Sequence, residues 1–235
     1  SVGVFPQSLY FETNSKQKSQ TITVINETDE PQAYKISVKD YMPDENGQMK
    51  EVETNERSAK DYIMFSPRRF TLPPHKTQNV RVAIRKTSEA KDGEYTSFLH
   101  IAETENNFGK KQEEKKEDEG MSVSIKMYMA TAIPVTIAKG NLVAKTDIVS
   151  YKKNGDKVDV ELQRKGTKSS RVNVVLLDSK GKELGRSNQV VIAKPEAKRT
   201  VSVELKNNEE KAKPSTIKLE DATTKKEISR QEISL

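Results

Sequence analysis

Apolar and polar side chains alternate along most of the chain, and this two-residue period predicts β-strands rather than helices. The clearest example is GMSVSIKMYMATAIP, residues 120–134, where every odd position from 121 to 129 carries a large apolar side chain. The even positions between them are mostly polar. Such a strand has one apolar face, which has to be covered either by its own domain or by another protein chain.

The first part of the chain contains about seven such segments, the number typical of an immunoglobulin-like sandwich. They are VGVFPQSLYF, QTITVIN, QAYKISVKDY, DYIMFSP, TQNVRVAIRK, EYTSFLHIAE and a strand that opens at residue 121 and runs towards Ile137. Asn46-Gly47 is a hairpin signal between two of them. The tract GKKQEEKKEDEG has no apolar residue, so a flexible loop is predicted over residues 109–120, with a short charged helix as the alternative.

A further set of about six or seven short alternating segments follows and predicts a second, smaller β-sandwich. KNGDK and DSKGKE are typical of tight turns within it. The chain of 235 residues is therefore expected to be all-β, with two immunoglobulin-like sandwiches in tandem. The expected domains are residues 1–138 and 139–235, joined by the short IAKGN linker.

Two local motifs predict how the first sandwich is built. In DGEY, Tyr95 is expected to form a tyrosine corner, in which its hydroxyl bonds back to nearby backbone; an Asp-Gly turn followed by a half-buried tyrosine is the alternative. In SPRRFTLPPHKTQNVRV, Pro67, Pro73 and Pro74 exclude a helix and indicate that the chain crosses between sheets.

The same stretch contains Arg68 and Arg69, whose guanidinium groups can bind an anion. The alternative is that they pair with nearby carboxylates.

Composition excludes several kinds of chemistry. The chain has no cysteine and only two histidines, His75 and His100, so no disulfide, thiolate site or histidine-based zinc site is expected. No catalytic motif or cofactor-binding loop is present, and an enzyme is not expected. The net charge of +6 is dispersed among acidic residues without a focused basic and aromatic patch, which argues against nucleic acid. No apolar run is long enough to span a membrane.

SAKDYIMFSPRRFTLPPHKTQNVRVAIRK and DGEYTSFLHIAE resemble the first domain of periplasmic pilus assembly chaperones, the PapD-like proteins of the chaperone–usher pathway. The similarity is best over residues 4–137. It implies a periplasmic chaperone, exported and seen here as the mature chain, that needs no cofactor. Its expected partners are secreted pilin-like subunits and an outer-membrane usher.

The resemblance also implies a use for the apolar stripe. In that family the last strand of the first domain lends alternating apolar side chains to an incomplete immunoglobulin-like subunit. The residues in question here are Met121, Val123, Ile125 and Met127. The alternative is that the odd side chains form the domain's own core, which is expected for Met129.

Family members hold the C-terminal carboxylate of the subunit with two basic residues, one from the first strand and one from the last. Ser8 occupies the first position, where it cannot carry the charge, and Lys126 stands near the second. Either Arg68 or Arg69 compensates, or the carboxylate is held in another way, or the protein has another client.

A different class of function is also compatible with the pattern. Tandem immunoglobulin-like domains occur in cell-surface adhesion or scaffold proteins, and a positive, lysine-rich chain suits anionic surface polymers. A free apolar strand can also pair with its twin, so a self-capping homodimer is a further expectation.

Overall fold

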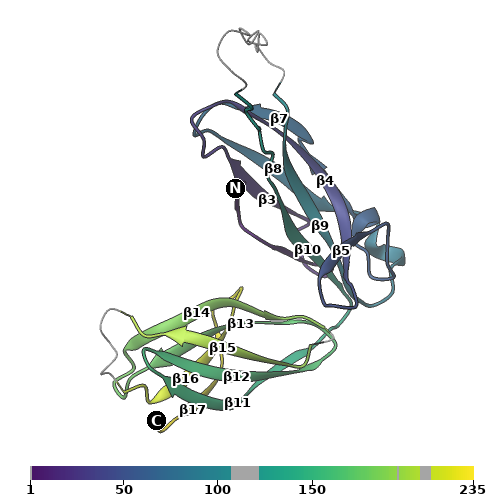
Figure 1. Ribbon diagram of the computed structural model, residues 1–235. Helices are drawn as coiled ribbons and strands as arrows, with labels where there is room; N and C mark the ends of the chain where they lie inside the picture. The colour runs from purple at the N-terminus through teal and green to yellow at the C-terminus, as the bar shows by residue number, and fades with distance from the viewer. Residues whose placement is uncertain (1, 107–121, 195, 207–212) are drawn as a thin grey trace. The chain divides into compact units, whose positions relative to one another are not determined.

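The computed structural model describes residues 2–106, 122–194, 196–206 and 213–235. These residues are almost all β; their helices are two short 3-10 turns, η1 (Lys60–Tyr62) and η2 (Thr87–Glu89). The chain divides into two compact units, Ser1–Gly140 and Asn141–Leu235 (Figure 1). The predicted fold class, all-β with two immunoglobulin-like sandwiches in tandem, is confirmed.

Unit 1 is built from two facing sheets. The first has the order β1-β3-β8-β6, formed by β1 (Gly3–Phe5), β3 (Ser19–Ile25), β8 (Thr77–Ile84) and β6 (Ile63–Ser66). The second has the order β2-β10-β9-β4-β5, formed by β2 (Leu9–Glu12), β10 (Ala130–Lys139), β9 (Gly93–Thr104), β4 (Gln32–Pro43) and β5 (Met49–Val52). A further strand, β7 (Arg69–Leu72), pairs with the start of β4 on the flank that β9 leaves free.

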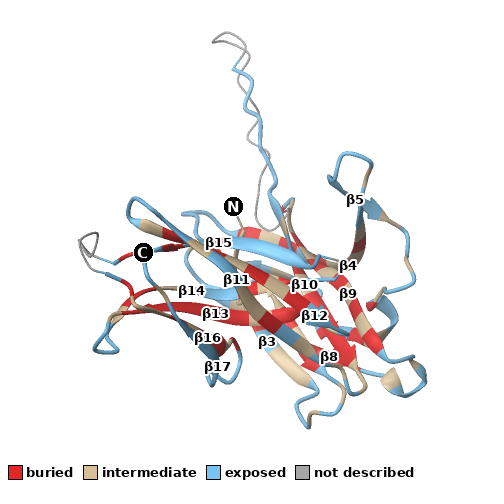
Figure 2. Cartoon of the chain, turned by 90° about the horizontal axis from the view of Figure 1, so that it is seen from below, coloured by how far each residue is buried: buried red, intermediate tan, exposed pale blue. Residues whose placement is uncertain are grey.

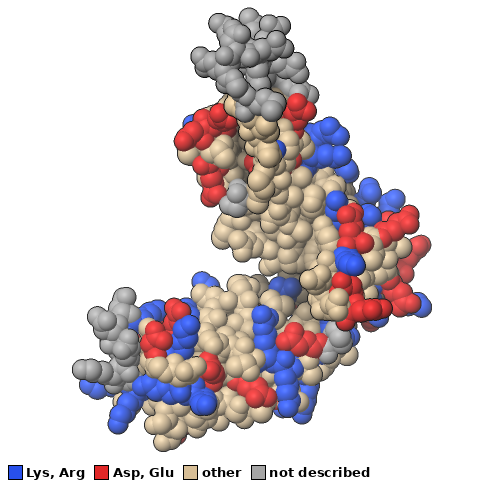
Figure 3. Space-filling view, viewed as in Figure 1, with Lys and Arg blue, Asp and Glu red and all other residues tan. Residues whose placement is uncertain are grey.

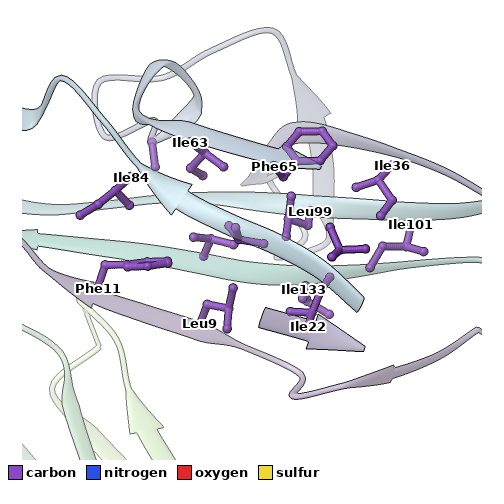
Figure 4. Close-up of a cluster of buried hydrophobic side chains, with 14 of the residues drawn as sticks. Leu9, Phe11, Ile22, Ile36, Ile63, Phe65, Ile84, Leu99, Ile101 and Ile133 are labelled. Carbon is purple, nitrogen blue, oxygen red and sulfur yellow. The ribbon is translucent and has the colours of Figure 1, made fainter. Parts of the chain in front are cut away.

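The core of unit 1 lies between these sheets because alternate side chains of each strand point inward. In β9, the odd-numbered Leu99 and Ile101 are fully buried while the even positions beside them are half-buried. Figure 4 shows these two side chains gathered with Ile22 of β3 and Ile133 of β10. Each such side chain contributes about 1.5–3 kcal/mol by burial.

The chain crosses between the sheets at the predicted prolines. Pro67 lies between β6 of the first sheet and β7 of the second, and Pro73 lies between β7 and β8, which returns to the first. Pro6 has the same effect, although VGVFPQSLYF was expected to form one strand. It separates β1, which pairs with β3, from β2, which runs parallel to β10. Proline has no N–H to continue a ladder, and this explains the division.

The number of strands and two element boundaries also differ from expectation. The described part of unit 1 contains the ten strands β1–β10, rather than about seven, because residues 2–11 form two strands and because β5 and β7 lie outside the predicted segments. The ladder of the last strand begins at Ala130 and not at residue 121. The residues Ile137–Lys139 of the expected IAKGN linker belong to β10, where Ile137 packs in the core.

Unit 2 also has two sheets. The first has the order β11-β12-β15, formed by β11 (Ala144–Asn154), β12 (Lys157–Gly166) and β15 (Lys198–Glu204). The second has the order β14-β13-β16-β17, formed by β14 (Glu183–Ile192), β13 (Ser170–Leu177), β16 (Thr216–Asp221) and β17 (Glu227–Glu232). The predicted tight turns join β11 to β12 and β13 to β14. Gly155, at the first of these turns, has a φ of 64°, which glycine adopts without strain.

Tyr95 is held in the geometry of a tyrosine corner. Its hydroxyl donates a hydrogen bond to the carbonyl of Lys91 at 2.6 Å. Its ring packs edge-on against Tyr62, with 5.6 Å between the ring centroids. The bond ties the turn before β9 to the start of the strand.

We expect Tyr95→Phe to lower the free energy of unfolding of unit 1 by about 0.5–1.5 kcal/mol, since the Lys91 carbonyl loses its donor. Chemical denaturation measures this change. Tyr62→Phe is the matched control, because the described residues give its hydroxyl no hydrogen bond. An equal loss in both variants would show that the hydroxyl of Tyr95 has no special role.

Candidate functional site

Residues 122–129, which we call the pre-β10 segment, are exposed at every position. The exposed fractions are 79% for Val123, 81% for Ile125 and 75% for Met127. Figure 2 shows this segment as an exposed stretch that extends beyond the sheets of unit 1. Such large apolar side chains are rarely left in water side by side unless a partner covers them.

The pre-β10 segment continues the alternation of β10. Within β10 the odd side chains Ile133, Val135 and Ile137 are buried in the core. A ladder with β9 running from Ala130 to Lys139 fixes this register. The odd side chains therefore change from covered to exposed along a single run of sequence.

The residues of the predicted apolar stripe differ in their exposure to solvent. Val123, Ile125 and Met127 are exposed, and Met121 lies outside the described residues. Met129 was expected to pack inside the domain, and this is wrong, because 42% of it is exposed. It still pairs through its carbonyl with the amide of Glu103, but the first odd side chain covered by the core is Ile133.

One flank of β10 is open beside this segment. On that flank, β2 pairs with Val135–Ala138, and the described residues provide no strand partner for residues 130–134. A hollow of about 200 Å³ lies here, lined by Val2, Val4, Gln7 and residues 131–133. Unpaired backbone groups at such an edge can bond to an added strand.

An apolar groove lies beside the beginning of β10 on another face. It has a volume of about 350 Å³ and is lined by Tyr41, Met49, Phe98, His100 and residues 130–132. The rings of Tyr41 and Phe98 meet edge-on at 5.1 Å. Burial lowers the pKa of His100, and the charge of Lys39 adds to this effect. No sequence pattern predicts this groove, because the residues that line it come from four separate strands.

The candidate carboxylate anchors do not converge. Lys126 lies in the pre-β10 segment, with its Nζ 5.4 Å from the ring centroid of Tyr128. Arg69 is the first residue of β7 and Arg68 directly precedes it, and strands β9 and β4 separate β7 from β10. Ser8 is half-buried between β1 and β2.

Arg68 and Arg69 instead contribute to a basic pocket of about 470 Å³. Its cationic lining residues are Lys35, Lys60, Arg68, Arg69 and Arg85. The expected alternative, in which the two arginines pair with carboxylates, finds no support, because the described residues place neither of them in an ion pair. The guanidinium of Arg68 lies 4.5 Å from the ring centroid of Phe65.

The described residues contain no group of three or more histidine, aspartate or glutamate side chains arranged to hold a metal ion. They also contain no helix with the length and hydrophobicity needed to cross a membrane.

Comparison with known structures gave distant matches. The class 5 fimbriae chaperone CfaA is 13% identical, with 100% of each chain covered and a TM-score of 0.49. The Escherichia coli chaperone DraB is 13% identical, with 100% of this chain and 96% of that chain covered and a TM-score of 0.46. The Salmonella enterica SafA pilin in complex with the SafB chaperone gave 14% identity, the same coverages and a TM-score of 0.45.

Sequence comparison was more decisive. No curated protein sequence matched the chain. Residues 3–137, however, match the family described as pili and flagellar-assembly chaperones, over its PapD N-terminal domain. The match extends from β1 into β10 and covers more than half of the chain, so this protein belongs to the pili and flagellar-assembly chaperone family.

Proposed function

We propose that the protein is a periplasmic chaperone that captures secreted pilus subunits by lending them the pre-β10 segment as a missing strand. One observation carries the proposal: Val123, Ile125 and Met127 are exposed, and in the sequence they continue the odd-numbered apolar positions that are buried in β10. Membership of the chaperone family supports it. The family also favours this function over that of a cell-surface adhesion or scaffold protein.

Capture rests on two kinds of contact. Backbone N–H and C=O groups of the segment bond to an edge strand of the subunit, and this affinity tolerates different subunit sequences. Val123, Ile125 and Met127 fill the open groove of the subunit, and Met121 extends the row. The flexible thioether of methionine adapts to grooves of different shape.

Burial supplies much of the driving force. Each of the three exposed apolar side chains gains about 1.5–3 kcal/mol when the subunit covers it. Ordering the segment opposes binding and costs free energy. The cost is reduced because one end of the segment is already anchored next to the β9–β10 ladder, where the amide of Glu103 donates to the carbonyl of Met129.

The remaining parts of the proposal follow from this mechanism. Capture by strand addition requires neither catalysis nor a cofactor. An outer-membrane usher is the proposed receiver of the subunit. Without a client, two copies of the chain are proposed to pair through the same segment as a self-capping homodimer.

Val123→Asp combined with Ile125→Asp is expected to weaken subunit capture by at least about a hundredfold, because two apolar contacts are lost and two charges enter the groove. The measurement is surface plasmon resonance with a pilin-like subunit that lacks its final strand. Both side chains are exposed, so the thermal midpoint of the free chaperone should not change.

Ser122→Asp combined with Ser124→Asp is the matched control. It adds the same charge to the same segment but at even positions, and capture should fall much less. Retained capture by the Val123 and Ile125 variant would refute the donated-strand mechanism. Equal losses in the two variants would refute the assignment of the odd face.

Lys126 is the proposed partner for a carboxylate of the subunit. Lys126→Gln should weaken capture by about three- to tenfold at low salt, and by less at high salt, because the attraction between exposed charges is screened. Lys16→Gln, which removes an exposed charge in the turn after β2, is the control. An identical effect of the two substitutions at every salt concentration would contradict a role for Lys126.

A further inference from the structure

The basic pocket of unit 1 brings five cations together without a balancing carboxylate in its lining. Lys35, Lys60, Arg68, Arg69 and Arg85 line it, and the ion pairs of the described residues include none of them. Figure 3 shows lysine and arginine side chains gathered along the edge of unit 1 where β7 and β4 lie. Concentrated positive charge in a hollow attracts anionic ligands.

The β-ladder makes this arrangement unfavourable for the free protein. Lys35 of β4 stands directly opposite Arg69 of β7. Like charges at directly opposed positions destabilise a sheet. An anion bound between these side chains would relieve the repulsion.

An open strand edge lies in the same pocket. On the flank away from β9, β7 pairs with Gln32–Lys35 and β5 pairs with Asp40–Pro43. The amide of Ile36 donates to the carbonyl of Arg68 at 2.8 Å. Ser37–Lys39 lie between these partners, and the ladders of the described residues do not cover them on this flank. Across the pocket, β6 is the last strand of its sheet.

The floor of the pocket is apolar. It includes the buried side chains of Ile36, Ile63 and Phe65. The volume of about 470 Å³ exceeds what a single phosphate or sulfate ion fills. A ligand that uses the cations, the strand edge and the apolar floor together has to carry negative charges, backbone amides and apolar side chains.

We propose that this pocket docks an extended acidic peptide segment of a partner protein along the open edge of β4. Glutamate or aspartate side chains of the segment pair with the arginines and lysines, and its backbone pairs with Ser37–Lys39. Apolar side chains of the segment contact the floor. The site is separate from the pre-β10 segment, so this interaction goes beyond the capture of subunits.

Fluorescence anisotropy with the full chain tests the proposal. The probe is a fluorescein-labelled hexapeptide of alternating glutamate and valine, and a peptide of alternating lysine and valine is the charge control. Arg68→Glu combined with Arg69→Glu should weaken binding of the acidic probe by at least about tenfold. Lys16→Glu combined with Lys76→Glu changes the net charge equally at exposed positions outside the pocket, and should weaken binding by less than about twofold.

A second variant separates binding from folding. Lys35→Gln combined with Arg69→Gln removes the like-charged pair, so the thermal midpoint should stay the same or rise while binding of the probe falls. Subunit capture should remain intact in this variant, which keeps the test independent of the proposed donated strand. If binding is lost only in proportion to a fall in the thermal midpoint, the proposal is wrong.

A third measurement tests the strand edge. An acidic probe with N-methylated valines keeps its charge but loses alternate backbone donors, and should bind at least about tenfold more weakly. If the methylated and unmethylated probes bind with equal affinity, charge attraction alone explains binding, and docking along β4 is wrong. Equal binding of the acidic probe to the wild type and to the Arg68 and Arg69 variant would remove the pocket as its site.

Discussion

The two-residue period of a β-strand connects the core of unit 1 to its exposed segment. The ladder between β9 and β10 fixes which side chains of β10 point inward, and Ile133, Val135 and Ile137 fill the core as a result. The same period continues into the pre-β10 segment. When the segment extends β10 as a strand on a subunit, this period puts its odd side chains on the same face as the buried odd side chains of β10.

Different forces dominate at the two edges of the larger sheet. Beside β10, exposed apolar side chains and an open backbone flank suit the addition of a strand with apolar contacts. Beside β4, five cations surround an apolar floor. Repulsion between Lys35 and Arg69 destabilises the protein when no ligand is bound. The first edge is suited to hydrophobic burial and the second to charge pairing. A single sandwich can in this way present two chemically distinct surfaces.

Much of the fold could be predicted because its signals are local. Alternation identifies strands, Asn-Gly pairs identify hairpins, and Pro67 and Pro73 mark the crossings between sheets. The division at Pro6 was missed because apolar alternation continues across it. The basic pocket was missed as a whole, since Lys35, Lys60 and Arg85 come from separate parts of the chain and only the paired arginines form a visible motif.

The sequence by itself determined the all-β fold, the register of the stripe and the resemblance to pilus assembly chaperones. Only the tertiary structure decided where along that stripe the core ends, which placed Met129 outside and Ile133 inside. It also decided that Arg68 and Arg69 line a pocket with Lys35, Lys60 and Arg85, where the described residues give neither arginine an ion pair. The reason is physical: periodicity is a property of neighbouring residues, whereas burial and charge pairing depend on strands that are distant in sequence and adjacent only after folding.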